Sequence, residues 1–329
     1  MSISSVTDDH YQSPPWLAGS HWQTIYAAQF APRPPIIYRR ERWLTTDSDF
    51  IDVDFTTGDI SDTAPILVLF HGLEGCSLSH YAVALMAAAQ ARGWRGAVAH
   101  FRGCSGEINL APRAYHSGDS DEIDFVLRRI AQQFPGSLRF AAGVSLGGNA
   151  LLKWAGIHGT GASKCVERIA SISAPHDLHA GAAALSRGFS QFYTWIFLRT
   201  LKAKSHQKLA QYPGLFSREK MEQSRNFFDF DDAVTAPIHG FSSCYDYWTR
   251  SSSGRFLPQI TVPALVLNAL NDPFVPTSSL SLPSQVSASV QLEYPPSGGH
   301  VGFVSGSPPG SLNWLIQRLF TWFGEAANG

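Results

Sequence analysis

The chain has 329 residues, of which 44% are hydrophobic and 16% charged, so it holds enough apolar material to bury a large core. This length fits one large domain with an insertion, and it is also compatible with two domains. The formal net charge is -1, so no global field favours a nucleic acid or an anionic membrane, and a neutral or small substrate is expected.

The cysteines and the apolar runs exclude two further classes. The four cysteines are Cys76, Cys104, Cys165 and Cys244. They form no CxxC pair, which argues against a zinc site and favours small buried side chains. Residues 1–9 are polar and acidic, unlike a signal peptide, and the apolar run at 192–198 is far too short to span a bilayer. We therefore expect a cytoplasmic protein with reduced thiols and no integral membrane span, of unknown oligomeric state.

Strand and helix patterns alternate along most of the chain. Residues 1–40 contain clustered prolines and predict an arm on the surface rather than a packed element. A hairpin is expected from the runs at 42–46 and 50–56. Further strands are expected at 66–70, 96–101, 138–144, 168–173, 264–268 and 290–294, and helices at 80–92, 119–134, 147–156 and 311–323. This order predicts an α/β fold with a mostly parallel twisted sheet and helices on both faces.

The alternation stops between about residues 178 and 258. This segment is aromatic, helical in places and locally basic, and it lies between two expected strands. It is therefore interpreted as an insertion within a single domain that spans residues 1–329. One hypothesis makes it a helical lid over a site, and the other makes it an excursion that covers only one edge of the sheet.

The motif GVSLG at 143–147 is the strongest chemical signal. It follows an expected strand and precedes an expected helix. In that setting Ser145 occupies a strained turn that projects its hydroxyl above the sheet, and Gly143 and Gly147 let the strand and the helix approach. The motif predicts Ser145 as a nucleophile, with an incidental serine in a Gly-rich turn as the alternative.

The sequence HGLEG at 71–75 follows the first buried strand. In a fold with this serine turn, such a loop supplies one backbone donor of an oxyanion hole, and the residue after the nucleophile supplies the other. These donors would be the N–H groups of Leu73 and Leu146. We expect His71 and Gly72 to shape the loop, with His71 acting through its own hydrogen bonds rather than in the chemistry.

Asp272 and His300 follow the last two expected strands. The chain order Ser145, Asp272, His300 is the order that a catalytic triad has in this fold. Asp272 would set the imidazole tautomer, His300 would accept the serine proton, and water would split the acyl-enzyme. Asp177, which follows an earlier strand, is a rival acid.

His116 and Asp121 fit a His-x4-Asp spacing that occurs in some acyltransferases. Two fixed positions are a weak signal. The favoured interpretation is structural, with His116 preceding an acidic helix start that Asp119 or Asp121 caps. The role of His116 stays open at this point.

These motifs together resemble the YheT-like branch of the α/β-hydrolases, relatives of the ABHD-type esterases and lipases. The matching stretches are WLAGSHWQT (16–24), HGLEG (71–75), FRGCSGE (101–107), RAYHSGDSDE (113–122), GVSLGGNALLKW (143–154), SAPHDL (173–178), FDDAVTAPIHGF (230–241) and NDPFVP (271–276). The resemblance implies a hydrolase of carboxylic esters without metal or organic cofactor, with Ser145, Asp272 and His300 at the triad positions. The match is weakest at 181–227, so the resemblance leaves substrate choice open.

We therefore expect a serine hydrolase that cleaves small-molecule esters with short to medium acyl chains, with no nucleic-acid partner. Acyl transfer to an alcohol is the alternative, because an aromatic stretch in the insertion could exclude water. Its members are Phe189, Phe192, Tyr193, Trp195 and Phe197. A non-catalytic binding protein on the same scaffold is a third possibility, which the presence of all three triad residues argues against.

Overall fold

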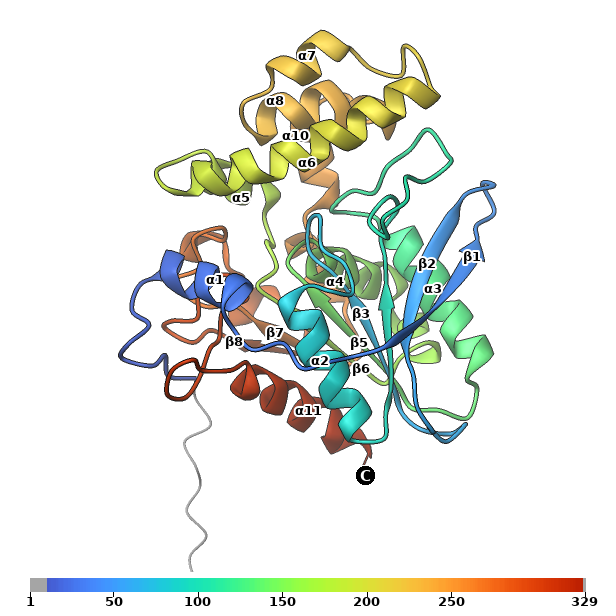
Figure 1. The fold of residues 1–329 in the computed structure, drawn as a ribbon, viewed down its shortest axis with the longest axis vertical. Coiled ribbons are helices and arrows are strands. Elements are labelled where there is room, and N and C mark those ends of the chain that lie inside the picture. Colours follow the sequence, from blue (N-terminus) through green and yellow to red (C-terminus); the bar gives the residue numbers. More distant parts are fainter. Residues whose placement is uncertain (1–10, 328–329) are drawn as a thin grey trace, which may run out of the picture.

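An eight-stranded sheet forms the centre of the computed structural model, which describes residues 11–327 (Figure 1). The polar stretch at 1–9 and the start of the expected arm lie outside the described residues. The strand order is β1-β2-β4-β3-β5-β6-β7-β8. β1 (Tyr38–Leu44) and β2 (Phe50–Thr56) form an antiparallel hairpin, β2 pairs antiparallel with β4, and all later pairs are parallel. The predicted α/β fold is confirmed.

The parallel strands lie close to their expected positions. They are β3 (Ile66–Phe70), β4 (Arg95–Ala99), β5 (Arg139–Val144), β6 (Arg168–Ile172), β7 (Ala264–Leu267) and β8 (Val290–Glu293). β3 is buried along its whole length because it lies between β4 and β5 and is covered on both faces. The largest difference is in the hairpin, where β1 begins at Tyr38 rather than at residue 42.

Helices cover both faces of the sheet. α2 (His80–Ala91) and α11 (Asn313–Ala327) pack on one face, and α3 (Ser120–Gln133) and α4 (Leu146–His158) pack on the other. Alternate side chains of each strand therefore enter different apolar clusters: Val68 joins α3 and α4, whereas Leu69 joins α2 and α11.

The N-terminal segment differs from its prediction as an unpacked arm. It contains helix α1 (Ser20–Gln29), and Leu17 just before this helix is fully buried. The prolines lie before and after the helix rather than inside it, so they delimit the helix without interrupting it. α1 lies beside the end of the sheet that carries β7 and β8 (Figure 1).

The insertion between β6 and β7 is helical. Its elements are α5 (Leu178–Leu185), α6 (Ser190–Gln211), α7 (Arg218–Gln223), α8 (Phe227–Phe230), a π-helical turn (Asp231–Thr235), α9 (Ala236–Ile238), α10 (Cys244–Ser251) and a 3-10 turn (Gly254–Gln259). These helices form a layer above the sheet in Figure 1, with apolar clusters of their own. Within residues 11–327, no helix combines the length and apolar character that crossing a bilayer requires.

Candidate active site

Ser145 lies on the tight turn between β5 and α4. Its φ of 53° and ψ of -117° place a non-glycine residue in a strained backbone conformation. A Cβ added to Gly143 would lie 2.5 Å from the carbonyl oxygen of Gly147, and one added to Gly147 would lie 2.6 Å from that of His71. Only glycine fits at these two positions, which is why strand and helix can meet at such a sharp turn.

His300 joins Ser145 to Asp272. Its Nδ1 lies 2.8 Å from Oδ2 of Asp272, and its Nε2 lies 3.0 Å from Oγ of Ser145. A carboxylate only accepts hydrogen bonds, so Nδ1 carries the proton and Nε2 presents a lone pair to the serine hydroxyl. Three side chains from the ends of β5, β7 and β8 thus form one continuous chain of hydrogen bonds.

Asp272 is held in place by the backbone that follows it. Its side chain is fully buried, and Oδ1 accepts the N–H groups of Phe274 at 2.8 Å and Val275 at 3.3 Å. The other oxygen is therefore left for His300. Asp177 has a different position: it caps the N-terminus of α5 by accepting from the N–H groups of His179 and Ala180. The structure thus pairs His300 with Asp272 and not with the rival acid.

Helix α1 supports the loop that carries His300. Oγ1 of Thr24 accepts the N–H of His300 at 2.9 Å. Oε1 of Gln23 accepts from Nδ2 of Asn271 and from the N–H of Gly298, both at 3.0 Å. No local pattern in the sequence links position 23 to position 298, so neither Gln23 nor Thr24 could be assigned this role from the sequence. The only signal was the resemblance of the stretch at 16–24.

The HGLEG loop lies directly against the serine turn. A Cβ added to Gly72 would lie 3.3 Å from Cβ of Ser145. Leu146 is the first residue of α4, whose first N–H groups have no intrahelical acceptor. Neither its N–H nor that of Leu73 donates to another of the described residues. Both N–H groups are therefore available to an acceptor, and that of Leu146 lies next to Ser145 at the partly positive end of α4.

His71 is a structural residue of this loop. Nε2 accepts the N–H of Phe101 at 3.1 Å, so the proton is on Nδ1, which donates to the carbonyl oxygen of Gly72 at 2.8 Å. Burial lowers the pKa of His71 to about 3, which keeps the ring neutral. Through these two hydrogen bonds the His71 ring connects the HGLEG loop to the segment that follows β4.

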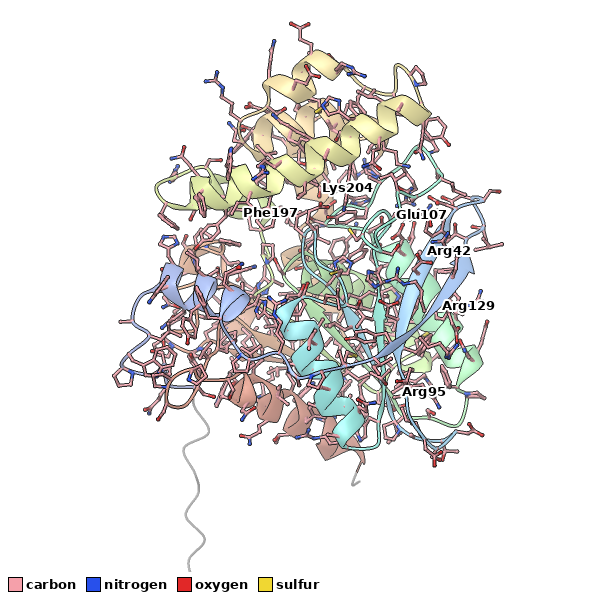
Figure 2. All side chains as sticks on the ribbon, viewed as in Figure 1. Arg42, Arg95, Glu107, Arg129, Phe197 and Lys204 are labelled. Atoms are coloured by element: carbon pink, nitrogen blue, oxygen red, sulfur yellow. The ribbon has the colours of Figure 1, made fainter. Side chains whose placement is uncertain are left out.

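The same loop is tied to the insertion through Glu74. Nζ of Lys204 on α6 lies 2.7 Å from Oε1 of Glu74, and the Tyr115 hydroxyl donates to the same oxygen at 2.8 Å. Glu74 directly follows Leu73, whose N–H is one of the two expected oxyanion donors, and its own backbone has a φ of 56°. Figure 2 shows Lys204 and Phe197 on the side of α6 that faces the sheet. The position of α6 and the shape of the oxyanion loop are therefore linked by an ion pair.

A cavity of about 170 Å³ lies between the sheet edge and the insertion, with Ser145 and His300 among its lining residues. More than half of its lining residues belong to the insertion, and most of these are apolar, for example Phe230. Buried charged groups also line it: burial lowers the pKa of Lys208 to about 8 and raises that of Asp231 to about 6. A mostly apolar pocket with a few polar groups is typical of a small-molecule site.

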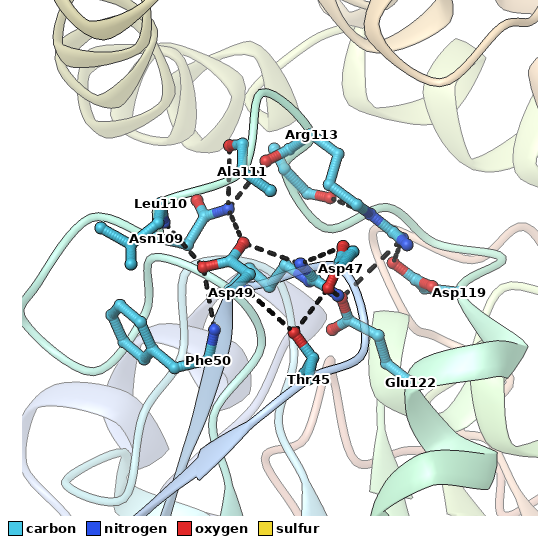
Figure 3. Close-up of polar contacts among 12 residues, drawn as sticks. Thr45, Asp47, Asp49, Phe50, Asn109, Leu110, Ala111, Arg113, Asp119 and Glu122 are labelled. Atoms are coloured by element: carbon cyan, nitrogen blue, oxygen red, sulfur yellow. Dashed lines mark hydrogen bonds and ion pairs between the residues drawn. The ribbon is translucent and has the colours of Figure 1, made fainter.

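A buried charge network fixes residues 101–119, which contribute to one wall of this cavity (Figure 3). Arg102 donates to Asp49 at 2.7 Å and also to Glu122, and Asn109 donates to Asp49 at 2.6 Å. Removing one partner would leave a buried charge without compensation, at a cost of roughly 3–5 kcal/mol. The network therefore holds this wall in one position.

His116 lines the cavity but has a structural environment. Nδ1 accepts the N–H of Gly118 at 3.1 Å, and the ring makes edge contacts with His239 and Tyr247 at 4.6 and 5.6 Å. Burial holds the pKa of His116 well below its usual range. Asp121 does not take part in these contacts, so the structure does not bring the His-x4-Asp pair together.

The aromatic stretch of the insertion divides between two sides of α6. Tyr193 and Phe197 face inward and contact Phe274, whose ring lies 4.2 Å from that of His300. Phe189 and Trp195 are about half exposed. Only part of the stretch can therefore exclude water from the site, because a helix that packs against the rest of the protein turns one face toward it.

Comparison with known proteins places the chain in a family. The profile of the alpha/beta hydrolase fold matches residues 65–307. The YheT protein of Escherichia coli (strain K12), whose name gives esterase as its expected activity, is 36% identical over 92% of this chain and 89% of its own. Phospholipase ABHD3 of Mus musculus is 28% identical over 98% of this chain and 79% of its own.

A solved structure agrees in fold. Est1E from Butyrivibrio proteoclasticus, determined with ferulic acid bound, is 14% identical and superposes with a TM-score of 0.55 over 89% of this chain and 100% of its own. At that identity the likeness concerns the fold alone. Together, the profile match and the likeness to YheT over most of both chains show that this chain belongs to the YheT-like branch of the α/β-hydrolase family.

Proposed function

We propose that the protein is a serine esterase that hydrolyses carboxylic esters of small molecules through an acyl-serine intermediate. The observation that carries this proposal is the hydrogen-bonded chain from Asp272 through His300 to Ser145, with distances of 2.8 and 3.0 Å. The names of the relatives agree with the reaction class: YheT is named for esterase activity and ABHD3 as a phospholipase.

The first half of the reaction forms the acyl-enzyme. Oγ of Ser145 attacks the ester carbonyl carbon while its proton passes to Nε2 of His300, and Asp272 stabilises the resulting imidazolium. The carbonyl electron pair moves onto oxygen, where the N–H groups of Leu73 and Leu146 stabilise the oxyanion. The C–O bond to the alcohol then breaks, and His300 returns the proton to the leaving alkoxide.

The second half consumes water. His300 takes a proton from a water molecule as its oxygen attacks the acyl carbon, the bond to Oγ of Ser145 breaks, and the proton returns to the serine. The products are a carboxylic acid, an alcohol and the free enzyme. Each oxyanion donor is expected to raise kcat by a factor of about 10²–10³.

We assign esters with short to medium acyl chains as the substrate class. This assignment rests on the mostly apolar cavity of about 170 Å³ that includes Ser145 in its wall. Acyl transfer to an alcohol is the less favoured reaction. The argument for it was that the aromatic stretch excludes water, but Phe189 and Trp195 are exposed and do not shield the serine.

The experiment combines turnover and labelling. The wild-type protein should hydrolyse p-nitrophenyl acetate or butyrate and react with a fluorophosphonate probe, and Ser145→Ala should abolish both. Folded wild-type protein that neither turns over these esters nor reacts with the probe would contradict the proposal, as would unchanged activity of Ser145→Ala. Product analysis with ethanol present separates hydrolysis from transfer, since transfer requires an ethyl ester.

A further inference from the structure

Four large apolar side chains in one short stretch of the insertion are exposed to solvent. They are Phe189, Phe192, Trp195 and Ile196, exposed by 52, 48, 55 and 41%. They make up four of the fourteen large apolar side chains that are exposed within residues 11–327, yet they fall within eight residues of sequence. Single exposed apolar residues are ordinary, whereas a cluster marks a surface that contacts something else. We call these four residues the aromatic face.

The aromatic face is continuous. The rings of Phe189 and Phe192 lie 5.7 Å apart, and those of Phe192 and Trp195 lie 6.1 Å apart and are nearly parallel. On the α1 side the ring of His21 lies 4.7 Å from that of Phe189. These contacts make one patch out of the start of α6, bordered by α1, rather than a set of scattered side chains.

The patch is separated from the candidate active site by one layer of side chains. Tyr193 lies on the inner side of the same turns of α6, and its ring is 4.7 Å from that of Phe274. Phe274 in turn contacts His300 at 4.2 Å. None of the four residues of the aromatic face lines the cavity, so the reaction does not account for their exposure.

Two exposed basic side chains border the patch. Residues 178–218 contain six lysines and arginines and no aspartate or glutamate, but Lys204 pairs with Glu74, Lys208 lines the cavity, and Glu222 on α7 lies 3.8 Å from His206 of α6. Arg187 and Arg199 are exposed at the two ends of the patch. The guanidinium of Arg199 lies 5.0 Å from the centre of the Trp195 ring, so its charge is held at the edge of the aromatic face.

We propose that the aromatic face docks on an anionic lipid surface. Aromatic side chains flanked by arginines are the composition of helices that lie in the membrane interface, with rings at the headgroup boundary and cations at the phosphates. The exposed Arg187 and Arg199 supply positive charge that an anionic surface would attract. Docking would bring lipid esters beside the cavity; this delivery rests on the proposed esterase function, whereas docking itself does not.

The test is sedimentation of the full-length protein with vesicles. We expect the wild type to bind vesicles of phosphatidylglycerol and phosphatidylcholine, and to bind pure phosphatidylcholine much more weakly. F192S/W195S should weaken binding to the anionic vesicles at least about tenfold, because each buried ring contributes that much. Arg187→Gln and Arg199→Gln should each weaken it roughly fivefold. Leu44→Ser is the control, since Leu44 is 73% exposed on β1, at the opposite edge of the sheet.

Three results would overturn the docking proposal. The wild type could fail to sediment with anionic vesicles, or F192S/W195S could bind as tightly as Leu44→Ser. The third is a dimer in analytical ultracentrifugation that F192S/W195S dissociates while vesicle binding is unchanged, which would make the face a contact between two copies. Ser145→Ala keeps this test separate from the esterase proposal, because it should still bind vesicles, and F192S/W195S should still cleave soluble p-nitrophenyl butyrate.

Discussion

Replacing Gln23 with leucine tests whether α1 holds the two loops that carry Asp272 and His300. Gln23 is 2% exposed, and its side chain makes three hydrogen bonds. Oε1 accepts from Asn271 and from the N–H of Gly298, and Nε2 donates to the carbonyl oxygen of Leu17, each at 3.0 Å. A single side chain therefore connects the acid loop, the base loop and the N-terminal segment.

The expected magnitude follows from these contacts. Leucine fills a similar volume but leaves two buried backbone groups and the partly buried amide of Asn271 without their partner. Each hydrogen bond contributes about 0.5–1.5 kcal/mol, so the free energy of unfolding of Gln23→Leu should fall by roughly 1.5–4.5 kcal/mol. The activity should also fall, because a displacement of about 1 Å between reacting groups can cost 10²-fold in rate. We expect kcat/KM to drop about 10- to 100-fold.

The assay pairs thermal unfolding with hydrolysis of p-nitrophenyl butyrate. Gln29→Leu is the matched control, because Gln29 is an exposed glutamine at the end of the same helix. The control should keep the wild-type Tm and kcat/KM. If Gln23→Leu behaves like Gln29→Leu in both measurements, α1 does not position the two loops.

Three further variants probe the site. Asp272→Asn should lower kcat about 10⁴-fold with an unchanged fold, because His300 would then hold the wrong tautomer; a kcat near the wild-type value would refute this role. Lys204→Met removes the ion pair with Glu74, which links α6 to the oxyanion loop. It should lower kcat for p-nitrophenyl butyrate more than it raises KM. An effect on KM alone would show that α6 contributes to substrate binding and not to the oxyanion loop. Burial raises the pKa of Asp231 to about 6, so the folded state keeps a proton that the unfolded chain releases above about pH 4. Stability from this group is therefore lost as pH rises from about 4 to 6, and Asp231→Asn should gain up to roughly 3 kcal/mol relative to the wild type over that range in urea titrations. A pH-independent difference between the two proteins would contradict this.

Much of the fold could be predicted because its signals are local. The continuous apolar run at Ile66–Phe70 indicated a strand buried on both faces, and it lies in the middle of the sheet as β3. The spacing of Gly143, Ser145 and Gly147 indicated a tight turn, since only glycine allows the close approaches found there. Element ends were less accurate, as at β1, because the pairing of a strand with its neighbour decides where it begins.

Other features could not be predicted because they depend on contacts between distant residues. α1 was missed because clustered prolines suggested irregular structure, although they stand outside the helix. The inward position of Tyr193 and the exposure of Phe192 could not be distinguished by residue type, since both are aromatic and adjacent in sequence. Their different exposure arises from which side of α6 packs against the rest of the protein.

The sequence by itself determined the order of the strands and of the helices that cover the sheet, the serine turn, and the chain order of Ser145, Asp272 and His300. Each of these depends on short-range patterns. Only the tertiary structure decided that Gln23 and Thr24 support the His300 loop, that Lys204 pairs with Glu74, and which side of α6 faces water. Thr24 and His300 are 276 residues apart in the chain. The physical reason is that such partners meet only when the sheet and the insertion have packed together.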